Sequence, residues 1–203
     1  MTREAAPIMK LYKTLIFIGM VVGPIYWLMF TDDGTRRTDT MVLWLAGGQL
    51  IDLNFKALDS HFKPADWKRV YPDADWQCKE TRSSLGDSLC YAEIASYNGI
   101  PSNYLSVFFY NEITTAVKLA YRDQYHNEIG RDLVEQLGKP SVKNQPDNSS
   151  ILQWETDSGL ILLKKTLKRG EDATLIWIAH DNNKTGREEP DHLNSPQAPI
   201  PAG

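Results

Sequence analysis

The sequence predicts an α+β protein in which one N-terminal membrane helix carries a small domain of antiparallel sheet with helices packed on one face. Three observations predict it. An uncharged apolar run covers residues 14–31. Short stretches of alternating apolar and polar residues, separated by turn residues, fill most of residues 76–179, as in antiparallel strands. Two helical segments divide these stretches, and the order helix, strands, helix, strands is typical of an α+β sandwich.

Length and composition limit the classes of protein that need to be considered. The chain has 203 residues, with 42% hydrophobic and 24% charged residues, which is typical of one globular domain with appendages. The net charge of -4 leaves no basic excess to neutralise phosphates, so the sequence argues against a nucleic-acid partner. The mean hydropathy of -0.40 is that of a soluble chain, so the apolar character is concentrated in one segment.

The uncharged run from Thr14 to Thr31 has the length and composition of a short transmembrane helix. Aromatic residues, which favour the membrane interface, stand near both of its ends. A cleaved signal peptide is the alternative, but the run ends in bulky residues instead of small ones and has no lipid-attachment cysteine. A buried core helix is a second alternative, although such helices seldom run this long without a polar residue. We therefore expect an uncleaved signal-anchor.

The orientation of this helix depends on two signals. Arg3, Lys10 and Lys13 precede the run while Arg36 and Arg37 follow it, which is a small bias toward a cytoplasmic N-terminus. A disulfide would point the same way, because disulfides persist in oxidising compartments. The expected location is a bacterial inner membrane, crossed once, with the C-terminal domain in the periplasm.

Gly19 and Gly23 form a GxxxG pattern within the run, and Pro24 follows. Small residues at this spacing let two membrane helices approach closely, which predicts membrane-helix packing and a homodimer. The alternative is that Pro24 simply kinks the helix.

The chain contains two cysteines, Cys78 and Cys90, on either side of a polar loop with a central glycine. They flank an expected hairpin, so a disulfide between them is predicted, worth about 3 kcal/mol through loop closure. The spacing differs from CxxC, which argues against a thioredoxin-like redox site. Two buried free thiols are the alternative.

The remaining elements follow in chain order. We expect residues 1–13 as a cytoplasmic N-terminus, 14–31 as the anchor, 32–49 as a linker, 50–180 as the exported domain and 181–203 as a disordered, proline-rich tail. The apolar stretch from Met41 to Ile51 is too short to span a membrane, and it either lies at the membrane surface or packs on the domain.

Two helices are predicted within the domain, and a third segment is ambiguous. Residues 53–62 fit both a helical face and a strand, and helix is favoured. Pro64 suits the first turn of a short helix that runs to Val70. An amphipathic helix is predicted for residues 126–137, ended by Gly138 and Pro140.

The predicted strands form two groups. The first group covers residues 76–80, 89–96, 104–110 and 117–121, with Asn98-Gly99 as a tight turn. Residues 141–150 are expected as a loop, and the second group covers residues 151–156, 160–167 and 173–179. In each half a helix is followed by a proline and then by a strand with a tryptophan, Trp76 or Trp154, which hints at an internal duplication.

The sequence offers little support for catalysis. Its four histidines lie far apart, at positions 61, 126, 180 and 192, with no HExxH or HxxxH spacing, so no metal site is expected. A GxSxG elbow, a P-loop and a GxGxxG motif are all absent. No cofactor is expected. Tyr104, Phe108 and Tyr110 form an aromatic strand that lines either a ligand or partner surface or the sheet core, and the core is favoured.

One family resemblance rests on pattern. Residues Phe55 to Tyr71, followed by hairpins, and a helix that ends in Leu137-Gly138-Lys139-Pro140 resemble small envelope lipoproteins of the SmpA/OmlA kind. The resemblance covers residues 55–110, and it implies a role in outer-membrane protein assembly without enzymatic activity. The present chain carries a membrane helix where those proteins have a lipid-attachment cysteine.

Together these features predict a membrane-anchored, non-enzymatic envelope protein that binds a protein partner. The alternatives are a periplasmic hydrolase whose site is assembled in space, or a small-ligand binding domain. A hydrolase predicts a deep pocket with a perturbed carboxylate or histidine.

Overall fold

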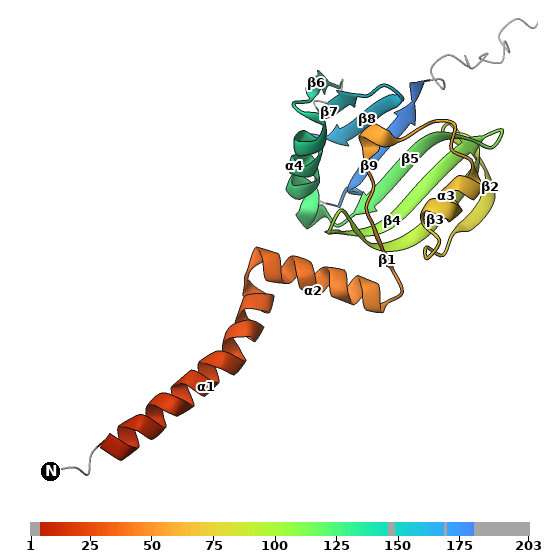
Figure 1. Ribbon diagram of the computed structural model, residues 1–203. Helices are drawn as coiled ribbons and strands as arrows, with labels where there is room; N and C mark the ends of the chain where they lie inside the picture. Colours follow the sequence, from red (N-terminus) through yellow and green to blue (C-terminus); the bar gives the residue numbers. More distant parts are fainter. Residues whose placement is uncertain (1–4, 146–148, 169, 181–203) are drawn as a thin grey trace, which may run out of the picture.

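The structure, a computed structural model, describes residues 5–145, 149–168 and 170–180. It consists of a long helix, a second helix turned away from it, and a domain built on one sheet (Figure 1). The predicted α+β class is confirmed: an N-terminal apolar helix precedes a mostly antiparallel, nine-stranded open sheet with helices packed against it. The tail expected at residues 181–203 lies outside the described residues.

The long helix α1 covers Ala5–Phe30, and one residue, Thr31, separates it from α2, Asp32–Leu45. Residues 32–49, expected as a linker, are therefore mainly helical. The Thr31 hydroxyl accepts a bond from the Gly34 amide, and Asp33 pairs with both Arg36 and Arg37 one turn later. An N-cap and these (i, i+3) and (i, i+4) pairs are strong local helix signals that the polar composition concealed.

The segment between α2 and the sheet is less helical than expected. After β1 (Gln49–Ile51) the chain forms only a short 3-10 turn, η1 (Phe55–Ala57). The Asn54 and Asp59 side chains accept bonds from backbone amides two residues later, and this local bonding competes with a helix. The segment still buries Leu53, Phe55 and Leu58 in the core, which explains why its apolar spacing resembled a helical face.

The first half of the domain is one helix followed by four strands. The helix α3 covers Pro64–Val70, as predicted, and Pro64 occupies its first turn. The strands form an antiparallel meander whose β3–β4 turn, Asn98-Gly99, has positive φ at both residues, as predicted for a tight turn. Their bounds are β2 Gln77–Ser83, β3 Gly86–Tyr97, β4 Ile100–Tyr110 and β5 Ile113–Tyr121.

The second half repeats this order. A short 3-10 turn, η2 (Asp123–Tyr125), leads into α4, His126–Leu137, which matches the predicted range, and Gly138 caps it with positive φ. The predicted loop at residues 141–150 in fact begins with a short edge strand. The strands are β6 Ser141–Asn144, β7 Ser150–Glu155, β8 Gly159–Lys164 and β9 Thr174–Ala179.

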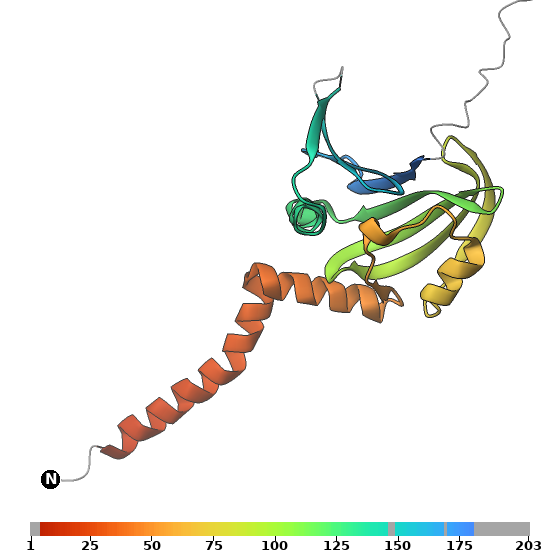
Figure 2. The same ribbon diagram turned by 45° about the horizontal axis from the view of Figure 1, so that its top comes forward.

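The two halves join at the middle of the sheet. The strand order is β1-β3-β4-β5-β9-β8-β7-β6, with β2 also pairing with β3, so the last strand of each half meets its counterpart. We call α3 with β2–β5 the first unit and α4 with β6–β9 the second unit. The two meanders therefore run outward from the β5–β9 seam (Figures 1 and 2).

A matching hydrogen bond ends the helix of each unit. The Trp76 indole N–H donates to the Tyr71 carbonyl at 3.2 Å, and the Trp154 indole N–H donates to the Gly138 carbonyl at 2.8 Å. Tyr71 and Gly138 are the C-caps of α3 and α4. The element order and these bonds agree with the predicted duplication, although Trp76 directly precedes the first strand of its unit and Trp154 lies in the second.

One hydrophobic core serves both units. It includes Trp67 of α3, Ile129 and Leu133 of α4, and Trp177 of β9, all of them at most 2% exposed. Since both helices bury side chains in the same core, they cover the same face of the sheet. The opposite face, which we call the outer face, keeps contact with solvent.

Candidate binding surface and membrane anchor

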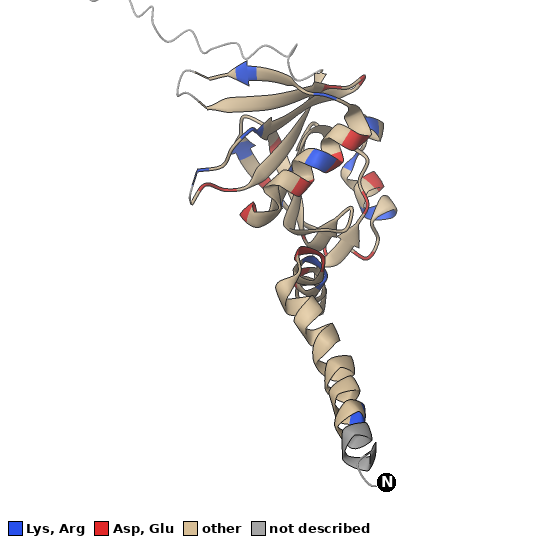
Figure 3. Cartoon of the chain, turned by 90° about the vertical axis from the view of Figure 1, so that its left-hand side faces the viewer, with Lys and Arg blue, Asp and Glu red and all other residues tan. Residues whose placement is uncertain are grey.

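The N-terminal helix has the properties of a membrane span. Residues Leu11–Phe30 form a 20-residue segment with a mean hydropathy of 1.6, and none of it is buried against the rest of the chain. In Figure 3 this helix projects from the domain with almost no charged residue along its length. A fully exposed apolar helix of this kind serves as a signal or an anchor, because it would otherwise hold its entire apolar surface in water.

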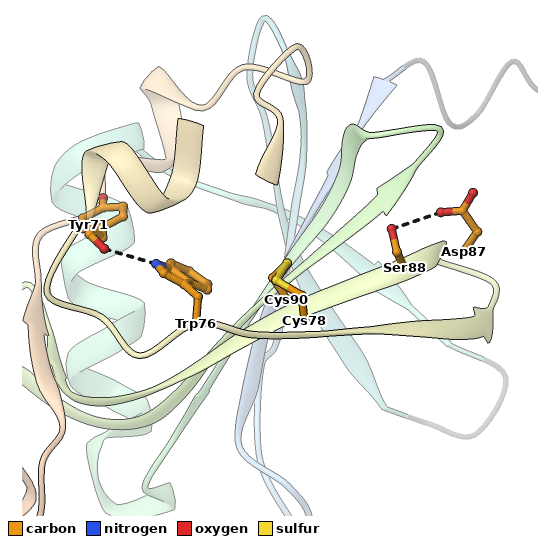
Figure 4. Close-up of a disulfide and its surroundings, with 6 residues drawn as sticks. All are labelled: Tyr71, Trp76, Cys78, Asp87, Ser88 and Cys90. Carbon is orange, nitrogen blue, oxygen red and sulfur yellow. Dashed lines mark hydrogen bonds between the residues drawn. A yellow bond between two sulfur atoms is a disulfide. The ribbon is translucent and has the colours of Figure 1, made fainter. Parts of the chain in front are cut away.

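The two cysteines form the predicted disulfide. Cys78 of β2 and Cys90 of β3 are directly opposed in the register, with Cα atoms 4.0 Å apart and the sulfur atoms bonded (Figure 4). The two cysteines are 12 residues apart in sequence, which is not the spacing of a CxxC redox pair. The bond links the two strands of a hairpin at the edge of the sheet. A disulfide indicates an extracytoplasmic domain.

The outer face is apolar where an exposed sheet face is ordinarily polar. Along β8 and β9, the residues that point toward the helices are at most 3% exposed: Ile161, Leu163, Leu175, Trp177 and Ala179. The alternate residues on the outer face are also apolar but only half-buried: Leu160, Leu162, Ile176 and Ile178. Antiparallel strands with one solvated face normally alternate apolar and polar residues, and these two strands depart from that pattern.

These side chains form one contiguous patch. The register places Leu160 opposite Ile178 and Leu162 opposite Ile176, so the four pack as two cross-strand pairs. Phe108 of β4 extends the patch across the seam, because it pairs with Ala116, which in turn pairs with Ile178. We call Phe108, Leu160, Leu162, Ile176 and Ile178 the outer patch.

The aromatic strand is not in the core as expected. Tyr104 and Tyr110 are 42% and 52% exposed, while Leu105, Val107 and Phe109 between and beside them are fully buried. The alternation therefore has the opposite orientation: Leu105, Val107 and Phe109 face the helices, whereas Tyr104, Phe108 and Tyr110 face outward. An aromatic, partly exposed strand is more typical of a binding surface than of a core.

A second open feature is the edge of the sheet at β6. All residues of this strand are exposed, including Val142, and in the described part of the chain β6 pairs only with β7. An unpaired strand edge offers backbone donors and acceptors to another chain.

The carboxyl groups with shifted pKa values are held by local hydrogen bonds. Among the described residues, no group of three or more histidine, cysteine or acidic side chains is arranged to hold a metal. The carboxyl groups with shifted pKa values, Asp33, Asp59 and Glu171, are all lowered, chiefly by hydrogen bonds from Arg37, from the His61 amide and from the Lys168 amide respectively. Each bond is local and lies at the surface, so none of these carboxyl groups has the raised pKa of a general acid.

The histidines that the structure describes have local roles. His126 shares a hydrogen bond with the Tyr121 hydroxyl at 2.8 Å, and the His180 ring bonds the Thr156 carbonyl at 2.9 Å. His61 contacts Asp59 at the surface. The three rings do not converge on a common site, and His192 lies outside the described residues.

The candidate helix-packing residues, Gly19 and Gly23, remain accessible on α1. Apart from the neighbouring backbone of α1, a Cβ atom added at either glycine would meet no described atom within 4 Å. The pattern is therefore free to contact a second helix, and the dimer stays a prediction.

Comparison with known proteins yields no match: no family model fits the chain, and no curated protein or solved structure is significantly similar to it.

Proposed function

We propose that this chain is a single-pass bacterial inner-membrane protein whose periplasmic domain is a non-enzymatic module that binds a protein partner through the outer patch. The observation that carries the proposal is the apolar outer face of β8 and β9, where Leu160–Ile178 and Leu162–Ile176 pair without full burial. Apolar side chains gathered on an exposed face mark protein contact sites more often than scattered ones do. The resemblance to SmpA/OmlA-type assembly proteins agrees with a partner-binding role.

Two further features support the membrane-bound, exported location. The apolar helix α1 is suited to remain as an anchor, since its end at Tyr26–Phe30 is bulky and unlike a cleavage site. The Cys78–Cys90 disulfide suits the periplasm.

Site-directed photo-crosslinking in the host cell tests this proposal. A photo-reactive amino acid replaces Leu162 or Ile176 in the full-length chain, and the control position is Asp157, an exposed residue in the adjoining turn. We expect both patch positions to crosslink to the same envelope protein and Asp157 to give no such product. Leu162→Glu should then abolish copurification of that protein while the disulfide still forms.

Two results would count against the proposal. Crosslinks equally strong at Asp157 would show that the patch is not the contact surface. Turnover of a defined substrate by the purified chain would contradict the non-enzymatic role.

The homodimer is tested separately. Gly19→Leu with Gly23→Leu should weaken self-association of the membrane helix by closing the surface that two helices share. Phe17→Leu with Val21→Leu is the matched control, since both residues are exposed and lie on the side of α1 opposite to the two glycines. If all variants dimerise equally, the two glycines do not form the helix contact, and the alternative that Pro24 simply kinks α1 is favoured.

A further inference from the structure

The helix α2 is oriented opposite to an ordinary surface helix, because its polar side chains face the domain. The Asp39 carboxylate pairs with Arg122 at 2.8 Å and accepts bonds from the Tyr125 hydroxyl at 2.7 Å and the Gln124 amide at 2.8 Å. Arg36 reaches Glu128 of α4 at 3.6 Å. Charged contacts thus fasten α2 to the start of the second unit.

The apolar side chains of α2, apart from the half-buried Leu43, point away from the domain instead. Met41, Val42, Trp44 and Leu45 are 54–66% exposed, and Leu50 just after the helix is 60% exposed. A surface helix normally buries its apolar stripe and exposes its charged face. The inversion implies that an apolar surface other than the domain covers this side of α2.

The corner between α1 and α2 fixes where that surface must be. The Thr31 hydroxyl donates to the Trp27 carbonyl at 2.6 Å while it also caps α2. Gly34 lies so close to α1 that a Cβ there would come within 2.2 Å of the Trp27 carbonyl oxygen. The two helices are therefore held in one arrangement, with α2 turned away from the line of α1 (Figures 1 and 2).

This corner lies at the expected boundary of the bilayer. The 20 residues of Leu11–Phe30 reach roughly 30 Å as a helix, which matches the hydrocarbon thickness. Tyr26 and Trp27, the aromatic residues typical of the membrane–water interface, stand in the last turns of α1. Since α2 begins two residues after Phe30, it starts at the level of the lipid headgroups.

The exposed side of α2 also forms an open groove that suits this boundary. The groove has a volume of about 410 Å³ and is lined by Met41, Trp44 and Leu50 together with Arg36, Arg37, Thr40 and Gly99. Arg36 and Arg37 both pair with Asp33 at 3.0 Å and Arg36 also reaches Glu128 at 3.6 Å, so two carboxylates face the two arginines, and Arg37 lies over the Trp27 ring. Binding should therefore depend on burial of apolar side chains and not on anionic lipid.

We infer that α2 is an interfacial helix: Met41, Val42, Trp44 and Leu45 insert into the bilayer surface beside α1 and hold the domain at a fixed orientation to the membrane. This inference rests on the anchor of the proposed function. Of the two alternatives for the stretch from Met41 to Ile51, it favours a location at the membrane surface over packing on the domain. The bilayer is the occupant that α1 necessarily brings next to α2, whereas a protein would have to be recruited.

Fluorescence quenching in vesicles tests the inference. Single variants Met41→Cys and Leu45→Cys of the full-length chain carry an NBD label, while the native disulfide stays oxidised, and are reconstituted into phosphatidylcholine vesicles. The matched control is Val142→Cys, an apolar strand residue with 52% exposure on the far edge of the sheet, and Val21→Cys reports on the anchor. We expect iodide to quench positions 41 and 45 at least threefold less than position 142. Lipids with a quencher near the headgroup should quench 41 and 45, and lipids with a deep quencher should quench 21.

The outcomes separate the two proposals. If positions 41 and 45 are as accessible to iodide as 142 while 21 remains shielded, the interfacial helix is overturned and the anchor stands. If 41 and 45 are shielded from iodide but insensitive to lipid quenchers, protein covers them and the inference is again overturned. If 21 is also accessible to iodide, the anchor and the inference both fail.

Discussion

The two units of the domain share one plan but are held together by different means. The first unit has strands of 7 to 12 residues, and its outer hairpin is fastened by Cys78–Cys90. The second unit has strands of only 4 to 6 residues, and its outer strand β6 is exposed and unstapled in the described residues. The second unit therefore depends on what it shares with the first: the β5–β9 seam and the common core.

The largest expected effect comes from removing the tryptophan at the seam. Trp177 is fully buried on β9, where it pairs with Val117 of the first unit and Ile161 of the second. Trp177→Ala should lower the free energy of unfolding by about 3–5 kcal/mol through lost burial and a residual cavity. Urea unfolding of the full-length chain in detergent, followed by circular dichroism, measures this loss.

Trp44→Ala is the matched control for that substitution, because Trp44 is 54% exposed on α2. Because Trp44 is not part of the core that unfolding disrupts, the substitution should change the free energy of unfolding in the same detergent by less than about 0.5 kcal/mol. Two separate transitions, of which Trp177→Ala shifts only one, would show that the units unfold independently and would contradict a shared seam.

The next effect concerns the staple of the first unit. Replacing Cys78 and Cys90 together by alanine should cost about 3 kcal/mol, since the disulfide closes a loop of 12 residues in the unfolded chain. Reductant should destabilise the native chain by a similar amount and leave the double variant unchanged. If the variant is as stable as the native chain, the difference between the two outer hairpins has no energetic consequence.

A third effect tests the polar contact between the units. The Tyr97 hydroxyl of β3 donates to Asp132 of α4 at 2.9 Å. Burial, followed by the nearby Asp132 carboxylate, raises the pKa of Tyr97 well above its usual value of about 10. Because the pKa of Tyr97 is raised in the folded state, the protonated hydroxyl contributes its full stabilisation below about pH 10. This contribution to the free energy of unfolding is lost as the pH rises through the folded-state pKa.

Tyr97→Phe should therefore cost about 1.5 kcal/mol at pH 7, the value of a hydrogen bond to a charged group. It should also reduce the loss of stability between pH 9 and pH 12, measured by urea unfolding at each pH. Some alkaline loss should remain, because burial also raises the pKa of Tyr121 and raises that of Tyr125 to about 12. An unchanged pH profile in Tyr97→Phe would show that this contact does not join the units.

The sequence predicted best the elements whose signals are local. Both α3 and α4 were placed at their observed bounds because Pro64 marks the start of one and Gly138 the end of the other. The disulfide followed from a hairpin with a cysteine on each strand. Such signals depend on a few neighbouring residues, so a single chain is sufficient to read them.

Three of the failures share a physical cause, which is that the partner of an apolar side chain lies elsewhere in space. Residues 53–62 have helical spacing, but they form an irregular segment with one 3-10 turn that buries Leu53 and Phe55 in the core. The aromatic strand was placed in the core because alternation does not say which face is inward. The outer patch was missed for the same reason: β8 and β9 are apolar on both faces, a pattern that otherwise indicates full burial.

The smallest effect is the most direct test of equivalence between the units. Trp76→Phe and Trp154→Phe each remove one indole hydrogen bond to a helix C-cap, from Tyr71 and Gly138 respectively. Each should cost about 0.5–1.5 kcal/mol, and the costs should add in the double variant because the sites lie in different units. The Trp154 bond is shorter and its side chain is 3% exposed, so its loss should fall at the upper end of that range. Urea unfolding of the two single variants and the double variant measures all three. If Trp154→Phe lowers the free energy of unfolding and Trp76→Phe does not, the two units share their topology but not the way in which the helix end is stabilised. The longer, disulfide-linked strands of the first unit would then hold the end of α3.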